Sequence, residues 1–178
     1  MRSGRIEKRK QRKRHSEAVI LFTVAEHAFA ISAQSVEEIR NLDGLLILPH
    51  GIAKGSISKV QQALERETKT YFVVEGNLHF HLKGSHANRL LLLRDAPVAL
   101  SVDAVNRMAE IVQLHPLPRA FQGEERAWYR GLALLGDEVV PLLNPAALLD
   151  ARAIESLQAA YIAAEEAAKP GPRTAASA

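Results

Sequence analysis

The chain has 178 residues, of which 47% are hydrophobic, and it carries a formal net charge of +3 and no cysteine. This length and composition predict a folded protein with one good core, in a single body or in two small lobes. The lack of cysteine excludes disulfides, thiol nucleophiles and cysteine-based zinc sites. No stretch approaches the roughly 18 apolar residues that cross a bilayer, and no apolar segment of a secretory signal follows the basic start. We therefore expect a cytoplasmic protein.

The positive charge is concentrated in residues 1–16, MRSGRIEKRKQRKRHS, which hold eight Lys or Arg and one Glu, or +7, and leave −4 for the rest. Such a block of like charge predicts a disordered basic tail. It could contact nucleic-acid phosphates or an anionic membrane, each basic residue contributing on the order of 1 kcal/mol near such a surface. The contacting residues would be Lys8, Arg9, Lys10, Arg12, Lys13 and Arg14.

The first expected elements after this tail are short strands. Residues 18–32 divide at Ala25-Glu26 into two β-rich runs, which predicts a hairpin. Ser35 favours one turn of helix over SVEEIRNL, and residues 45–49 form a short apolar segment. Residues 56–68 place Ile57, Val60 and Leu64 at helical spacing, which predicts a helix.

The rest of the chain predicts more strands and one late helix. Residues 70–82 are expected to form a hairpin around Glu75-Gly76-Asn77, and residues 88–103 another that turns at 94–97. A strand at 108–114 and a polar loop at 115–127 follow. Gly136-Asp137 is a hairpin signal between apolar runs. Asn144 then predicts the cap of a helix from Pro145 to about 168, with a frayed tail at 169–178.

The search for catalytic chemistry is mostly negative, since the nucleophile-elbow, phosphate-loop, dinucleotide-binding and zinc-protease motifs are all absent. On the predicted strand, His79 and His81 share a face and are weak candidates for an incomplete metal site. Trp128 is expected to anchor the core or a partner interface. Asp103 is expected to cap a turn. We expect no cofactor, no small-molecule substrate and no enzymatic activity.

Three blocks, in order, resemble the CheW-like domain of bacterial chemotaxis signalling. They are FAISAQSVEEIRNLDGLLILP (29–49), PVALSVDAVNRMAEI (97–111) and RGLALLGDEVVPLLNPAALL (130–149). The resemblance covers roughly residues 17–150. It implies a mostly β fold of two intertwined five-stranded SH3-like barrels with a C-terminal helix. The chain would then divide into the basic tail 1–16, the CheW-like domain 17–150 with a helical insertion at 56–68, a helix at 151–168, and the tail 169–178.

The resemblance also implies a non-catalytic adaptor that couples chemoreceptors to a CheA-type histidine kinase. The candidate partner-binding residues are Val36, Glu37, Glu38, Ile39, Arg40, Glu75, Asn77 and Trp128. If residues 36–40 form a helical turn, Val36 and Ile39 share a partly buried face and one of the two glutamates is exposed. The middle of the chain departs from the family, because Glu75 stands where the family's N-x-R-G motif has its Arg.

Two alternatives to the adaptor remain. One is the same fold with a different partner, nucleic acid or an anionic membrane, reached through the basic tail. The other is a metal-binding protein or enzyme that uses His79, His81 and Glu75.

Overall fold

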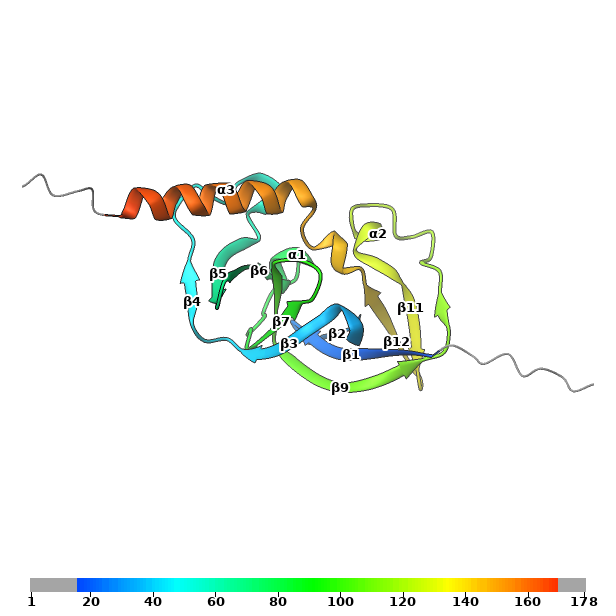
Figure 1. Ribbon diagram of the computed structural model, residues 1–178. Helices are drawn as coiled ribbons and strands as arrows, with labels where there is room; N and C mark the ends of the chain where they lie inside the picture. The colour runs from blue at the N-terminus through cyan, green and yellow to red at the C-terminus, as the bar shows by residue number, and fades with distance from the viewer. Residues whose placement is uncertain (1–15, 170–178) are drawn as a thin grey trace, which may run out of the picture.

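Two six-stranded sheets make up the body of the protein (Figure 1). The computed structural model describes residues 16–169, so the basic residues of the expected N-terminal tail and most of the expected C-terminal tail lie outside the described residues. Sheet A has the order β10-β11-β12-β2-β1-β9, and sheet B the order β3-β7-β8-β6-β5-β4. Sheet A contains β1 (Glu17–Val24), β2 (His27–Ser32), β9 (Ala104–Ile111), β10 (Leu114–His115), β11 (Tyr129–Leu135) and β12 (Glu138–Leu143).

Sheet B is built from the middle of the chain, which leaves sheet A after β2 and returns to it at β9. Its strands are β3 (Val36–Asn41), β4 (Leu45–Ile47), β5 (Val60–Arg66), β6 (Lys69–Glu75), β7 (Arg89–Leu93) and β8 (Val98–Val102). The pairs β2–β12 and β6–β8 are parallel, and the other ladders are antiparallel. The first and the last strands of the described chain therefore both belong to sheet A, and the strands between β2 and β9 form sheet B.

Short helices connect the strands, and one long helix ends the described chain. The three short 3₁₀ helices are η1 (Ala33–Ser35), η2 (Gly55–Ile57) and η3 (Pro145–Ala147). The α-helices are α1 (Gly76–His79), α2 (Glu125–Trp128) and α3 (Ala151–Ala168). No helix of the described chain combines the length and the apolar character that a membrane crossing requires.

The core has three parts, because many strands bury both faces. One cluster lies within sheet A and includes Val19, Leu21 and Val140. A second, within sheet B, includes Tyr71 and Leu92. The third is shared by the two sheets and α3 and is the largest. Its fully buried members include Phe22, Ile31, Phe72, Leu91, Leu100, Leu143 and Leu157.

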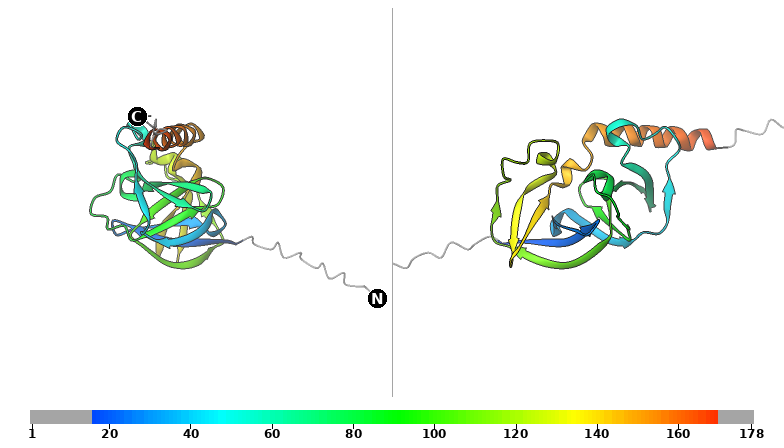
Figure 2. Two further views of the ribbon diagram at one scale, coloured as in Figure 1. Left: turned by 60° about the vertical axis from the view of Figure 1, so that its left-hand side comes forward. Right: turned by 180° about the vertical axis from the view of Figure 1, so that it is seen from behind.

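Helix α3 lies across sheet B, over β5 and β6 (Figures 1 and 2). Its inward residues recur at helical spacing, with Leu157 fully buried and Ile154 and Tyr161 packed against the shared core. The Tyr161 hydroxyl donates a hydrogen bond to Glu65 of β5 at 2.6 Å. The helix is therefore attached to sheet B by an apolar stripe, which is how most surface helices gain their stability.

The expected mostly β fold with a C-terminal helix is confirmed, but the barrels are not. The strand ladders form two open sheets of six strands each, rather than two closed barrels of five. Sheet B is nevertheless strongly curled. Glu38 of β3 forms an ion pair with Arg66 of β5, although three strands separate β3 from β5 in the order of the sheet.

Three expected hairpins are present. The β1–β2 turn is Ala25-Glu26, and both residues adopt positive φ, as a two-residue hairpin turn of this type requires. The β7–β8 hairpin and the β11–β12 hairpin at Gly136-Asp137 also occur at the predicted places. Asp103 has the predicted turn role, because its carboxylate accepts hydrogen bonds from the backbone N–H groups of Ala25 and His86.

Four local predictions are wrong. The helix expected over 56–68 is η2 followed by strand β5, and the helical turn expected at 35–42 is strand β3. The hairpin expected at 70–82 is strand β6 followed by α1, since β6 pairs instead with β5 around Glu67-Thr68. The final helix begins at Ala151, with Asp150 accepting a hydrogen bond from the Ala153 N–H, so Asn144 is not its cap.

Candidate functional site

A cavity of about 550 Å³ lies where the connections of the two sheets meet, and we call it the junction cavity. Its walls come from the η2–β5 connection, α1, the segment directly after α1, α2 and η3. The lining residues are Gly55, Ser58, Lys59, Leu78, His79, His81, Glu124, Ala127, Trp128 and Ala147. It therefore joins two residues predicted as metal ligands, His79 and His81, with one predicted as a partner contact, Trp128.

His79 has a fixed neutral form at the wall of this cavity. The side chain is only 2% exposed, and its Nδ1 lies 2.9 Å from the Lys59 Nζ. An ammonium group can only donate, so Nδ1 accepts this hydrogen bond and the ring proton lies on Nε2. Nε2 is buried and has no partner in the described part of the chain, an arrangement that costs about 1–3 kcal/mol.

The surroundings of His79 and Lys59 oppose positive charge on both. Burial, then the charge of Lys59 and that of His81, lowers the pKa of His79 from 6.5 to about 3. Burial also lowers the pKa of Lys59, and the carboxylates of Glu124 and Asp150 act against this shift. Lys59 therefore carries the positive charge of the pair, and His79 stays neutral as its hydrogen-bond acceptor.

Trp128 joins the two histidines by ring contacts. Its ring centroid lies 4.9 Å from that of His79 and 5.4 Å from that of His81. It also packs against Phe80, which stacks on Phe29 of the shared core with centroids 4.3 Å apart. Trp128 is half-buried, so it both anchors α2 to the core and presents apolar surface to the cavity.

The arrangement does not suit a metal ion. His79 and His81 do not share a strand face, since His79 ends α1 and His81 follows it with a positive φ. The Nδ1 of His79 already accepts a hydrogen bond from the Lys59 ammonium, so it is not free to bind a metal, and the positive charge of Lys59 would repel a metal cation. In the described residues, no three His, Asp or Glu side chains converge as a ligand set.

The depressed pKa of His79 predicts an acid-sensitive fold. Because the folded-state value lies below 6.5, stability from neutral His79 is present above pH 6.5 and is lost as the pH falls toward about 3. Between pH 6.5 and 5 this loss amounts to about 1.5 kcal/mol. Glutamine at position 79 keeps an acceptor for Lys59 but does not titrate. We therefore expect this loss of stability between pH 6.5 and 5 to be absent in His79→Gln.

Urea unfolding at several pH values would measure this difference. Burial raises the pKa of Glu75, so the contribution of Glu75 to the free energy of unfolding increases as the pH falls toward 4.5, opposite to that of His79. Comparing wild type with His79→Gln removes that contribution, because both proteins retain Glu75. Parallel stability profiles for the two proteins between pH 6.5 and 5 would show that His79 does not control the acid sensitivity.

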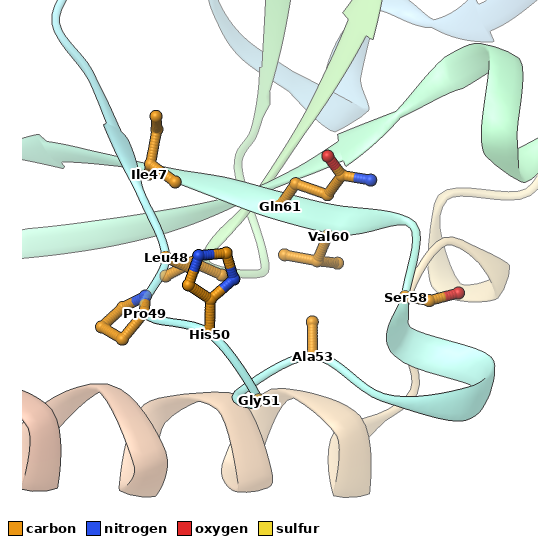
Figure 3. Close-up of a pocket in the computed structure, with 9 residues that line it drawn as sticks. All are labelled: Ile47, Leu48, Pro49, His50, Gly51, Ala53, Ser58, Val60 and Gln61. Atoms are coloured by element: carbon orange, nitrogen blue, oxygen red, sulfur yellow. The ribbon is translucent and has the colours of Figure 1, made fainter.

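A second cavity, of about 310 Å³, lies in the β4–β5 connection beside α3 (Figure 3). Figure 3 shows Ala53 and Val60 turned toward the space beside His50. Ile47 is 81% exposed, which is the highest exposure among the large apolar side chains of the described chain. Ser58 lines both this cavity and the junction cavity, so the two flank the same loop.

Glu75 and Asn77 come together at a third cavity, of about 270 Å³, which Ile47 also lines. Glu75 is not at the tip of a hairpin, as the sequence predicted, but at the junction of β6 and α1. Burial raises the pKa of its carboxyl group. Gly76 follows immediately and is buried against Ser101, so this junction is part of the fold as well as a surface.

The predicted partner surface at 36–40 is the edge strand β3. A register shift between Val36 and Glu38 is present in its pairing with β7. Val36 is buried and Glu37 exposed, as predicted, but Ile39 is 43% exposed, so the two apolar residues do not share a buried face. Glu37 accepts a hydrogen bond from the Tyr71 hydroxyl at 3.0 Å, and Arg40 lies 3.9 Å from Glu38.

Comparison with known proteins identifies the family. A family model of the CheW-like domain matches residues 18–153. The chain belongs to the CheW-like domain family. Its structure matches 15 solved chains. One is the scaffolding protein TtCheW from Thermoanaerobacter tengcongensis, with 16% identity, a TM-score of 0.67 and coverage of 78% of this chain and 96% of that chain. At this identity the likeness is evidence on the fold alone. No curated protein matches the sequence.

The CheW-like domain match includes both sheets and ends at the first residues of α3. It thus contains β3, Glu75 and the junction cavity. Lys59 was not among the predicted site residues, because the pattern of residues 56–68 predicted a helix there. Its hydrogen bond to His79 spans 20 residues, and no local pattern indicates such a partner. The six basic residues proposed to contact phosphates or membranes lie outside the described chain.

Proposed function

We propose that this chain is a non-catalytic adaptor that couples a chemoreceptor to a CheA-type histidine kinase. The observation that carries the proposal is the CheW-like domain match, which extends over both sheets rather than over an isolated motif. The solved relative TtCheW is itself described as a scaffolding protein. An adaptor needs binding surfaces and no reactive group, and the junction cavity holds its one deeply buried histidine in a neutral, hydrogen-bonded form.

The strand β3 is the surface that we assign to a partner. It is an edge strand of sheet B, so one side of its backbone is open to a partner strand or loop. Ile39 places an exposed apolar side chain on one face of this strand, and the charged residues Glu38 and Arg40 lie on the other face, because side chains alternate along a strand. A partner at this edge would bury the apolar side chain on one face of the strand and meet the charged side chains on the other.

The test is binding of the purified chain to the receptor signalling domain and to the kinase regulatory domain encoded by the same genome. We expect wild-type protein to bind at least one of them. We expect Ile39→Glu to weaken that binding at least tenfold, which corresponds to about 1.4 kcal/mol, because it replaces the exposed apolar side chain with a charged one. Biolayer interferometry with immobilised adaptor would measure both affinities.

Met108→Glu is the matched control. Met108 is 64% exposed on β9, an edge strand of sheet A, so its replacement introduces the same charge at a comparable apolar position. Both variants should unfold at nearly the wild-type temperature, since exposed substitutions usually change stability by less than about 0.5 kcal/mol. Absence of binding to either partner would overturn the adaptor proposal. Equal weakening of partner binding by Ile39→Glu and Met108→Glu would overturn the assignment of the partner surface to β3.

A further inference from the structure

The half-buried ammonium group of Lys59 has more N–H donors than it has hydrogen-bond acceptors in contact with it among the described residues. It lies in the wall of the junction cavity, and its one recorded hydrogen bond goes to a neutral imidazole. An ammonium group has three N–H donors, so two remain for other acceptors. Within residues 16–169, Lys59 has no carboxylate at ion-pair distance. A half-buried cation without a contacting anion is unfavourable, and an anionic ligand would relieve this.

The rest of the cavity is suited to an apolar body. The half-buried Trp128 provides an aromatic wall, and Leu78, Ala127 and Ala147 add aliphatic surface. The volume of about 550 Å³ is within the range of small-molecule sites. The cavity therefore combines one cationic donor with apolar walls, which is the usual pattern of a site that orients a ligand by one polar group.

We propose that the junction cavity binds an organic carboxylate, whose carboxylate accepts a hydrogen bond from Lys59 and whose apolar body lies against Trp128. This ligand is either a free small molecule or an acidic side chain of a partner protein. His79 is a positioning residue, because it holds the Lys59 Nζ through its Nδ1. Glu124 lines the same cavity and its negative charge opposes the ligand, so Glu124→Gln should strengthen binding.

The chain has a single tryptophan, and it lies in this cavity, so fluorescence reports on the site directly. We would titrate the full chain with sodium benzoate and follow Trp128 emission, with sodium chloride added to equal ionic strength. We expect a saturable change with benzoate. Benzamide and benzylamine, which have the same ring without the negative charge, should bind at least tenfold more weakly.

Substitutions test the role of Lys59. Lys59→Met should weaken benzoate binding at least tenfold, and Lys59→Arg, which keeps the charge, should retain it. Lys54→Met is the matched control, since Lys54 is exposed, lies five residues earlier and does not line the cavity. If Lys59→Met does not fold, the Lys59→Arg variant and the comparison of benzoate with benzamide still decide the question.

A blocked glutamate, the α-amide of N-acetylglutamate, distinguishes the two sources. If the blocked glutamate saturates the site at a lower concentration than benzoate does, the ligand is an acidic side chain of a partner protein. If benzoate saturates the site at the lower concentration, the ligand is a free small-molecule carboxylate. The proposal is overturned if neither probe gives a saturable change, if benzamide matches benzoate, or if Lys59→Met binds as wild type does.

Discussion

Truncation of Leu157 to alanine should lower the free energy of unfolding by about 2–5 kcal/mol, the usual range for a buried leucine. Leu157 is fully buried and is the only residue of α3 within the core of the described chain. Its loss leaves a cavity between α3 and the shared core, next to Ile154 and Tyr161. For a chain of this size the expected fall in the unfolding temperature is about 5–20 °C, measurable by circular dichroism.

Ile162→Ala on the same helix is the control. Ile162 is 54% exposed, so little apolar surface returns to water when it is shortened. Alanine also has the higher helix propensity, and the net change should stay within about 1 kcal/mol. Equal destabilisation by the two variants would mean that the buried side chain of Leu157 stabilises the protein no more than the exposed side chain of Ile162 does.

Replacement of Gly76 by alanine should lower the free energy of unfolding by about 1–3 kcal/mol, as is usual for an overpacked position. A Cβ at this position would lie 2.5 Å from the backbone oxygen of Ser101 and 3.1 Å from a methyl group of Val24. Neither neighbour can move cheaply, because Ser101 belongs to strand β8 and Val24 is fully buried. Either α1 or β8 must therefore shift.

A shift of α1 would also change the junction cavity, since α1 carries His79 against Trp128. We expect the emission of Trp128 to change in Gly76→Ala, while Asn77→Ala, the next residue of α1, should leave both emission and stability nearly as in wild type. Unaltered stability and emission in Gly76→Ala would show that the backbone around Gly76 adjusts freely, and that it does not set the geometry of the cavity.

Three hairpin turns and the family were predictable because their signals are local. Ala25-Glu26 and Gly136-Asp137 each lie between apolar runs, and the two residues of a tight turn decide where such a hairpin closes. The three blocks that resemble the CheW-like domain fall within residues 18–153, which the family match covers. The predicted mostly β fold followed from these short segments alone.

The helix predicted over 56–68 failed because sheet B buries both faces of β5. Ala63 belongs to the shared core and the adjacent Leu64 to the core of sheet B. A strand buried on both sides loses its alternation of polar and apolar residues, and its pattern can then match helical spacing. A register shift between Val60 and Gln62 disturbs the alternation further, as the shift between Val36 and Glu38 does in β3.

The sequence by itself therefore determined the strand-rich fold, three of the hairpin turns and the family, all of which depend on residues close together in the chain. Only the tertiary structure decided which chemistry meets in the junction cavity. Lys59, His79 and Trp128 are 20 and 49 residues apart along the chain and come from connections that belong to different sheets. Their meeting depends on how the two sheets pack on a shared core, and no local pattern of residues encodes that packing.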